Sequence, residues 1–390
     1  MCNYPGCDNE TTDKSQYCSK TCRDRYSKLK RRIEKAAADE INREGQRAFD
    51  LELSKNLTSK LRSEAKKRDY TTLLRDSLST FSPSTPVPFK SDPNKATVDW
   101  VIHFTDWHVG QRTSQEHTGG LYEQSTEITK YQVDKLLEHE FSIFDVESKS
   151  KNIRKIWHPI TGDIVEGDSM RPAQLRQIDM PVTQQTIEVF DILCKYIRSE
   201  LTLPGIEEII IDVVGGNHDR TTPKAGNAGL GESDYCDTYS WLIGAMLERV
   251  FADEPRVSVT NWDTFFGYRK FGGLRHAFEH GATIRGGGGF IGMPFYPIVN
   301  TARKYESMLD GVDVVWFGHF HQPAIAPLGK RGWVISGGAL PATTHFVQSS
   351  FKSIREPTQW LVEIHEEHGI TGFIPLYAPT PALRKTKIWK

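Results

Sequence analysis

The sequence predicts an α/β fold, and three observations lead to that prediction. Short apolar or β-branched runs recur along residues 98–378 and end in Gly, polar and His residues. Longer segments with helical periodicity separate several of these runs. The polar residues after the runs include Asp, Asn and His, and ligands in open α/β sheets collect at the carboxyl ends of strands. We therefore expect alternating strands and helices whose loops converge on one crevice.

The elements can be placed from these runs. Strands are predicted at 100–105, 155–161, 208–214 and 313–317, and later strands at 332–338 and 359–365 close the sheet structure. Helices are predicted at 122–144, 179–200 and 237–251. The helix at 179–200 has an apolar face that includes Val189, Ile192 and Leu193, which indicates that this face packs on a sheet.

Five short motifs carry residues that bind metals. They are Asp106-Trp107-His108, Gly162-Asp163, Gly216-Asn217-His218-Asp219, His280-Gly281 and Gly318-His319-Phe320-His321. One such motif alone is more often a turn or a hydrogen-bonded core histidine, but five motifs, four of them at strand ends, favour a metal site. Their Asp, Asn and His side chains suit Mn, Fe, Zn or Co better than Mg or Ca, because imidazole favours transition metals.

This set of motifs resembles the calcineurin-like metallophosphoesterase superfamily, whose pattern is D-x-H, G-D, G-N-H-D/E, H and G-H-x-H. The resemblance covers residues 98–378, and all five blocks occur in order. It implies a two-sheet β-sandwich flanked by helices, the metallo-dependent phosphatase fold. It also implies a hydrolase that acts on phosphate esters without a covalent enzyme intermediate.

The resemblance implies a role for each site residue. Asp106, His108 and His321 would hold the first metal, Asn217, His280 and His319 would hold the second, and Asp163 would bridge both. His218 would be the acid beside the leaving group, with Asp219 in support. Two metals about 3.5–4 Å apart can clamp both the attacking and the departing oxygen of a phosphoryl displacement. We expect manganese in both positions, with Fe, Zn, Co or Mg as alternatives.

Four of the six cysteines lie close together near the N-terminus. They are Cys2, Cys7, Cys18 and Cys22. Two close pairs of thiolates are a tetrahedral structural zinc set, and so small a segment cannot bury a core without a metal. We predict a zinc finger over residues 1–23, against the alternative of four unligated cysteines on a tail. Cys194 and Cys236 lie far apart, and we expect them to be small buried hydrophobic residues.

A basic segment follows the predicted finger. Its cations include Arg23, Arg25, Lys28, Lys30, Arg31 and Arg32. Such clusters bind phosphate backbones, although a charge run is more often a solvated helix face. Residues 24–76 are predicted to be a basic helical arm, which could also serve a protein partner or self-association. Residues 77–96 are rich in Pro and Ser and predict a linker, so the phosphoesterase domain is expected over 97–390.

Composition limits the remaining choices. The net charge is -1, which excludes a uniformly basic nucleic-acid coat, so any affinity for nucleic acid must come from local patches. No apolar run approaches the roughly 20 residues that span a bilayer. The N-terminus has no apolar run typical of a signal peptide. We therefore expect a cytoplasmic protein without a membrane partner, in the host cytoplasm if a phage encodes it.

The function predicted first is a two-metal phosphodiesterase that hydrolyses nucleic acid, as an exonuclease-like DNA nuclease. Within the superfamily, the chain departs from the nuclease subunits of double-strand-break repair, because Gly162-Asp163 is not followed shortly by His. Its likeness is greater to phage-type DNA exonucleases around 280–300 and 336–375. The alternatives are a phosphatase or small-molecule phosphodiesterase, and a non-catalytic nucleic-acid-binding adaptor.

Several residues outside the ligand set could contact a substrate phosphate. The arginines nearest to the motifs in sequence are Arg171, Arg176, Arg220 and Arg285. Two glycine-rich loops, 224–231 and 286–289, could flank the substrate, and backbone N–H groups in such loops bind phosphate. His103, His158 and His276 lie in or near predicted strands, and we expect them to be core or surface residues.

Overall fold

The computed structural model describes only part of the chain. The described residues are 1–3, 5–8, 10, 16, 18–32, 35, 91–170, 174–222, 232–285, 293–343, 347–348, 352 and 354–381. The chain divides into two compact units, Met1–Thr72 and Leu73–Lys390. In the first unit, residues 20–32 are helical, while most of the predicted arm and linker lies outside the described residues. Within the described part, no helix has the length and apolar character to cross a membrane.

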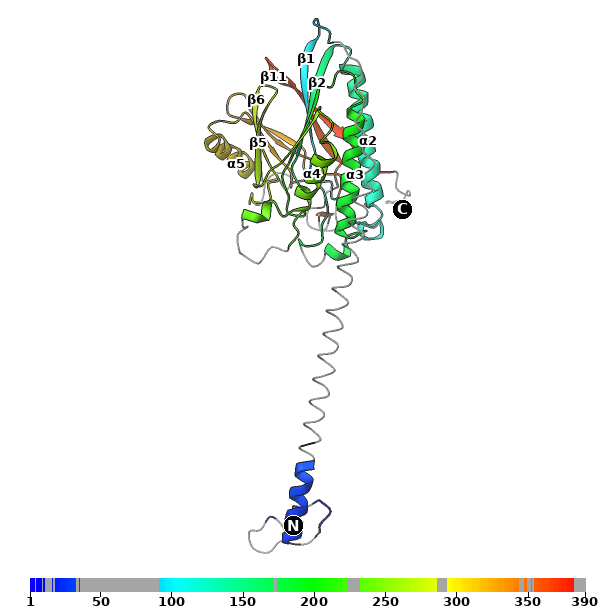
Figure 1. Cartoon of the computed structure of the whole chain (residues 1–390), viewed down its shortest axis with the longest axis vertical. Coiled ribbons are helices and arrows are strands. Elements are labelled where there is room, and N and C mark those ends of the chain that lie inside the picture. Colours follow the sequence, from blue (N-terminus) through cyan, green and yellow to red (C-terminus); the bar gives the residue numbers. More distant parts are fainter. Residues whose placement is uncertain are drawn as a thin grey trace. The chain divides into compact units, whose positions relative to one another are not determined.

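The first of two β-sheets has six strands, in the order β11-β10-β1-β2-β3-β4 (Figure 1). Their bounds are β1 (Ala96–His103), β2 (Lys151–Ile160), β3 (Glu208–Val213), β4 (Val257–Asn261), β10 (Thr358–His365) and β11 (Gly369–Tyr377). Strands β1 to β4 are parallel, whereas β10 runs antiparallel to β1 and β11 antiparallel to β10. The carboxyl ends of β1, β2 and β3 therefore lie at one edge.

The second sheet has five strands, in the order β5-β6-β7-β9-β8. Their bounds are β5 (Phe266–Phe271), β6 (Leu274–Glu279), β7 (Val314–Phe317), β8 (Ala324–Leu328) and β9 (Gly332–Ser336). Strands β6, β7 and β9 are parallel, and the two antiparallel strands β5 and β8 form the edges. The predicted strands at 332–338 and 359–365 are confirmed as β9 and β10, in different sheets.

Helices cover the outer faces of both sheets (Figure 1). They are α2 (Thr126–Glu147), α3 (Val182–Glu200) and α4 (Tyr239–Val250) on the first sheet, and α5 (Phe295–Met308) on the second. Helix α2 begins later than predicted because Ser125 caps it, accepting a hydrogen bond from the backbone N–H of Ile128. Thr238 caps α4 in the same way, through the N–H of Trp241.

Strand β1 shows how the layers are held together. Trp100 and Ile102 pack in the core between the first sheet and its helices. Val101, which points to the opposite face, packs between the sheets together with Trp157 and Trp316. A strand that is buried on both faces needs a continuous apolar run, and this is the pattern that predicted it. The predicted α/β architecture, two sheets flanked by helices, is confirmed.

Candidate metal centre

The candidate ligands lie directly after five parallel strands of the two sheets. Asp106 and His108 follow β1, Asp163 follows β2, Asn217 follows β3, His280 follows β6, and His319 and His321 follow β7. The sequence analysis placed four of the five motifs at strand ends. The structure adds the fifth, because His280 comes immediately after Glu279, the last residue of β6. Both sheets therefore contribute loops to a single site.

Most of these ligand candidates have an unusual backbone conformation. Asp106, His108, Asp163, His319 and His321 all have positive φ, between 48° and 69°. They are five of the seven non-glycine residues with positive φ in the described part of the chain. Each such residue costs roughly 1–3 kcal/mol and persists only where its surroundings impose it. The fold thus accepts strain in order to aim these side chains at one another.

Asp106, His108 and His321 form the first group. His321 Nε2 lies 3.2 Å from Asp106 Oδ1 and 3.1 Å from His108 Nε2. The other oxygen of Asp106, Oδ2, accepts hydrogen bonds from Thr105 Oγ1 at 2.7 Å and from the backbone N–H of His319 at 2.9 Å. Oδ1 is buried and accepts no hydrogen bond from the described residues. An orphaned carboxylate oxygen beside two imidazole nitrogens fits a bound cation.

The second group is centred on His280. Its Nε2 lies 3.0 Å from Asp163 Oδ2, 3.1 Å from Asn217 Oδ1 and 3.3 Å from His319 Nδ1. Its Nδ1 lies 2.8 Å from the backbone oxygen of Thr161, which can only accept, so in the neutral ring Nδ1 carries the hydrogen and Nε2 presents a lone pair. Acceptor atoms therefore converge. Separations of about 3 Å match the edges of a coordination shell with bonds of about 2.1 Å.

Asp163 connects the two groups. Its carboxylate lies within 4.8 Å of ligand atoms of His280 and His319, and within the same distance of those of His108 and His218. Its Oδ1 accepts the backbone N–H of His218 at 2.7 Å, which holds the carboxylate in place. The loop carrying Gly216 approaches so closely that a Cβ there would lie 2.1 Å from Asp163 Oδ1. This arrangement is the one expected of a bridging ligand.

The charges of the cluster perturb the pKa values of its members. Burial lowers the pKa of His280, but the nearby carboxylates of Asp163 and Asp106 outweigh burial and raise it to about 9. Burial and the charge of His280 lower the pKa of His319 to about 4. Burial opposes ionisation of Asp163, yet His280 and His218 hold its pKa below the usual range. Metal binding must therefore displace a proton from this cluster.

His218 lies beside the ligands, and Glu166 holds its ring. His218 Nδ1 lies 2.9 Å from the backbone oxygen of Glu166 and 3.5 Å from its Oε2. The same Oε2 lies 2.8 Å from His108 Nδ1. Burial opposes ionisation of Glu166, but His218 and His108 hold its pKa at about 2. This glutamate was not predicted from the sequence, where its position three residues after Asp163 was the one available signal.

Asp219 has a different role from Glu166. Its Oδ2 accepts the backbone N–H groups of Asp163 at 2.8 Å and Gly216 at 2.7 Å, and Ser240 Oγ at 2.6 Å. The described residues include no hydrogen bond between Asp219 and the ring of His218. Asp219 therefore ties together the loops after β2 and β3, while Glu166 provides the support that was expected of Asp219.

The four N-terminal cysteines gather in the first unit. Their Sγ atoms lie within 4.8 Å of one another, and none forms a disulfide. Three separations are 3.6 Å for Cys7–Cys18, 3.5 Å for Cys18–Cys22 and 3.7 Å for Cys7–Cys22. The backbone N–H of Cys18 also donates to Cys2 Sγ at 3.4 Å. A tetrahedral zinc ion with Zn–S bonds of about 2.3 Å requires sulfur separations of about 3.8 Å.

The remaining predicted residues fall into three classes. His103, His158 and His276 are buried core histidines, as expected. Arg171 and the glycine-rich segments 224–231 and 286–289 lie outside the described residues. Arg176 and Arg285 are exposed, whereas Arg220 lines a hollow that also includes His280. Cys194 is buried as predicted, but Cys236 is only partly buried.

Comparisons with known proteins add limited information. No protein-family model matches the chain, and the search of curated proteins finds no relative. Among solved structures, a hypothetical protein from Pyrococcus horikoshii OT3 is 13% identical, with 73% of this chain and 89% of that chain covered and a TM-score of 0.35.

Two further solved structures are an archaeal phosphodiesterase and a zinc complex of Vps29 from Entamoeba histolytica. The first is 12% identical over 71% of this chain and 99% of its own, with a TM-score of 0.29. The second is 14% identical over 71% and 99%, with a TM-score of 0.30. Likeness at this level assigns no function, which has to be argued from the site itself.

Proposed function

We propose that the chain is a two-metal phosphoesterase that hydrolyses phosphodiester bonds in nucleic acid, as an exonuclease-like DNA nuclease. The observation that carries the proposal is the convergence of acceptor atoms in two groups that share Asp163. The donor set of carboxylate, amide and imidazole groups suits manganese and its neighbours in the transition series. Two such cations, when bound, neutralise charge on a phosphate and activate water.

The protein's own groups supply the remaining chemistry. Burial lowers the pKa of His218, but the carboxylates of Asp163 and Glu166 raise it overall, so the ring can hold a proton near neutral pH. With Nδ1 directed at the backbone oxygen of Glu166, Nε2 is the atom left to give a proton to the departing alkoxide. Glu166 stabilises the charged ring before that transfer.

The N-terminal unit supports nucleic acid as the substrate. Residues 20–32 form a helix whose less exposed positions include Cys22, Tyr26 and Leu29, one to two turns apart on a single face. Seven cations of this helix are exposed, namely Lys20, Arg23, Arg25, Lys28, Lys30, Arg31 and Arg32. The sulfur separations fit a zinc ion that would fix the segment before the helix. A small fold that presents positive charge outward is suited to a phosphate backbone.

The substrate class is tested with five substrates and one inactive control. The full chain, loaded with Mn, is assayed on single- and double-stranded DNA, RNA, bis-p-nitrophenyl phosphate and mono-p-nitrophenyl phosphate. We expect hydrolysis of DNA and of the diester, and loss of both in Asp163→Asn, which excludes a contaminating nuclease. Activity on the monoester alone would rule out the nuclease. Inactivity with every metal tested would favour the adaptor.

The role of the basic helix is tested by its salt dependence. Replacing Arg23, Arg25 and Lys28 with Gln should lower the slope of log affinity against log salt by about 2.7 for duplex DNA, because each phosphate contact contributes about 0.9. The matched control replaces three exposed cations of the larger unit, Lys149, Lys330 and Arg331, with Gln. Equal slopes in the two triple variants would contradict a specific role for the helix.

Metal analysis of the unsubstituted chain should find one zinc per chain in the N-terminal cysteine cluster, and this zinc should be lost in Cys18→Ser.

A further inference from the structure

A row of aromatic side chains runs along the edge of the second sheet, and we call it the aromatic strip. It consists of Tyr235, Phe265, Phe266, Tyr268 and Trp262. Successive ring centroids are 5.7 Å apart for Tyr235–Phe265, 4.9 Å for Phe265–Phe266, 6.2 Å for Phe266–Tyr268 and 5.0 Å for Tyr268–Trp262. The five rings are thus in continuous contact from one end to the other.

The strip is open to solvent yet held firmly. Phe265 is 38% exposed and Tyr268 is 54% exposed. Trp262 Nε1 donates to Asp212 Oδ1 at 2.8 Å, which fixes the indole plane. Gly267 lies between two of the rings, and a Cβ there would come within 2.2 Å of Phe278 and 2.9 Å of Trp262. Exposed aromatic rings held in place in this way form a preorganised surface for another flat, apolar group.

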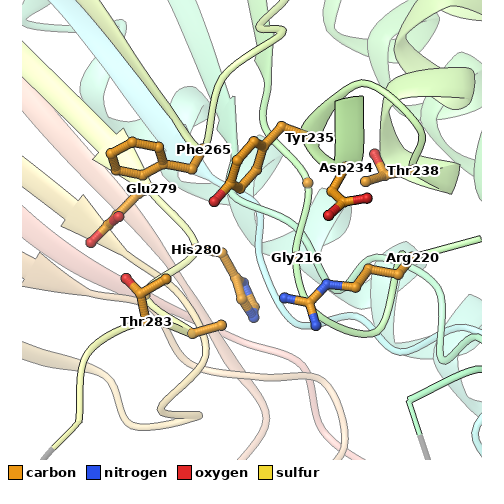
Figure 2. A pocket seen from close by; sticks show the side chains of 12 residues that line it. Gly216, Arg220, Asp234, Tyr235, Thr238, Phe265, Glu279, His280 and Thr283 are labelled. Carbon is orange, nitrogen blue, oxygen red and sulfur yellow. The ribbon is translucent and has the colours of Figure 1, made fainter. Parts of the chain in front are cut away.

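One end of the strip reaches the candidate metal centre. A hollow beside His280 is lined by Gly216, Arg220, Tyr235 and Phe265 (Figure 2). Figure 2 shows the two rings next to each other and the guanidinium of Arg220 turned toward His280. Gly216 and His280 belong to the loops that hold the second group of ligand candidates. A chain leaving the metal centre on this side would meet Tyr235 and Phe265 first.

The other end of the strip lies in a second hollow, which Trp262 and Tyr268 line together with Lys270. Two arginines of that hollow are neutralised by carboxylates, Arg269 by Asp212 and Arg275 by Asp313. In contrast, the side chains of Arg220 and Lys270 form no ion pair or hydrogen bond with the residues that the structure describes. A cation without an ion pair among the described residues therefore lies at each end of the strip, and the hollow beside Arg220 also contains the carboxyl groups of Asp234 and Glu279.

We propose that the aromatic strip binds a single strand of nucleic acid whose scissile phosphate lies at the metal centre. Bases would stack on the rings, with backbone phosphates contacting Arg220 at one end and Lys270 at the other. Rings in series with positive charge at both ends suit a chain of alternating flat bases and phosphates. A duplex does not fit, because its base faces are covered by their neighbours. This inference rests on the proposed function, since it names the substrate form for the same site.

The test measures binding without cleavage. The full chain, carrying the Gln substitutions at Arg23, Arg25 and Lys28 so that the basic helix does not dominate, is titrated in EDTA against a fluorescein-labelled ten-nucleotide oligothymidylate. Phe265→Leu and Tyr268→Leu should each raise the Kd roughly tenfold, because base–aromatic stacking is worth about 1–3 kcal/mol per base. The aromatic exchanges Phe265→Tyr and Tyr268→Phe should leave the Kd unchanged.

Matched controls decide the outcome. Tyr131 and Tyr377 are 39% and 48% exposed on α2 and β11, so Tyr131→Leu and Tyr377→Leu should not alter the Kd. Three results would overturn the proposal that the strip binds a single strand. They are an unchanged Kd in Phe265→Leu and Tyr268→Leu, an equal loss of affinity in the controls, and tighter binding of a blunt duplex. Replacing Arg220 and Lys270 with Gln should lower the salt slope by about 1.4 for a single strand, and an unchanged slope would also overturn it.

The two proposals can fail separately. Hydrolysis of bis-p-nitrophenyl phosphate with Mn by the unsubstituted chain tests the metal centre on its own. If the unsubstituted chain does not hydrolyse this diester, the proposed function fails, whereas the binding titration still decides whether the strip holds a single strand.

Discussion

Two clusters of buried histidines and carboxylates in this molecule resemble each other in composition and differ in chemistry. One is the candidate metal centre at the ends of the strands. The other, which we call the glutamate pair, consists of Glu140 on α2, Glu200 and Tyr196 on α3, and His158 on β2. All four of its side chains are buried in the core between the first sheet and its helices.

Hydrogens can join every contact within the glutamate pair. Tyr196 donates its hydroxyl hydrogen to Glu140 Oε2 at 2.6 Å, and His158 Nε2 lies 2.8 Å from Glu200 Oε2. Burial raises the pKa of both glutamates well above the usual range. Burial also lowers the pKa of His158 to about 4. The cluster is therefore uncharged, although Glu140 Oε1, Glu200 Oε1 and His158 Nδ1 form no hydrogen bond with the described residues.

In the metal centre, when the histidine rings are neutral, the carboxylate oxygens and imidazole nitrogens that face one another are all hydrogen-bond acceptors. The outward nitrogens of His108 and His280 already point at Glu166 Oε2 and at the backbone oxygen of Thr161, so the inward nitrogens offer lone pairs once the rings are neutral. Asp106 Oδ1 also has no donor among the described residues. Burial opposes ionisation of this carboxyl group, but unlike those of the two glutamates its pKa is held below the usual range by His321. The two clusters contain similar residues, but they differ in where the hydrogens lie. This difference separates a site that can bind a cation from a structural network.

The largest expected effect on metal content and turnover comes from a substitution at the centre of the metal centre. Asp163→Asn keeps the size of the side chain but removes the charge shared by both groups of ligands. We expect loss of at least one metal per chain and a fall in bis-p-nitrophenyl phosphate hydrolysis larger than the roughly 10–100-fold typical of outer-shell changes. Metal analysis and steady-state kinetics measure the two effects.

The matched variant in the other cluster is Glu200→Gln, which also exchanges a buried carboxyl for an amide. It should leave metal content and turnover unchanged, because the glutamate pair contributes no ligand atom. A similar loss of metal in Glu200→Gln would show that the two clusters are not distinct, and full metal content in Asp163→Asn would remove the case for a bridging carboxylate.

A smaller effect is expected at the contact that orients the ligands. Glu166→Gln keeps an oxygen near His108 Nδ1 but removes the charge that stabilises protonated His218. We expect metal affinity or turnover to fall about 10–100-fold. The midpoint of the alkaline limb of turnover, where His218 loses its proton, should shift to lower pH because the pKa of His218 falls. Glu140→Gln is the control. An unchanged pH profile in Glu166→Gln would exclude Glu166 as the partner of His218.

Strong local signals made much of the fold predictable. The apolar runs that became β1, β2, β3 and β7 are buried on both faces, so periodicity and length identified them. Helix starts were less accurate, because the caps Ser125 and Thr238 depend on where the preceding loop places them. The edge strand β5 carries polar and aromatic residues on a partly exposed face and was not predicted as a strand.

The candidate site also contains residues that could be predicted from the sequence and residues that could not. Residue types and spacing were enough to select the ligand candidates, because five such motifs occur together and four of them follow predicted strands. The supporting contacts could not be read from the chain. Glu166, Thr161 and Gln174 act on ligands or on His218 from other loops, so only folding reveals which carboxylate, carbonyl or amide meets which ring. The aromatic strip was likewise hidden, because its members come from two separate segments.

The smallest expected effect concerns stability and pH, and it compares the two clusters without any metal. Both glutamates of the pair have pKa values raised above the unfolded value, so the folded state binds more protons than the unfolded state. Their contribution to stability is therefore complete below about pH 4.5 and is lost as the pH rises toward their folded pKa values.

Glu200→Gln removes one of these titrations while its amide can still meet Glu140 and His158. The free energy of unfolding, measured in EDTA by urea titration from pH 5 to 8, should fall less steeply with pH than in the unsubstituted chain, by up to about 1.4 kcal/mol per pH unit. Glu138→Gln, an exposed change on the same helix, should leave the slope unchanged. Parallel curves for Glu200→Gln and the unsubstituted chain would mean that Glu200 is ionised in the folded protein. The contrast between a protonated structural cluster and a metal-binding cluster would then fail.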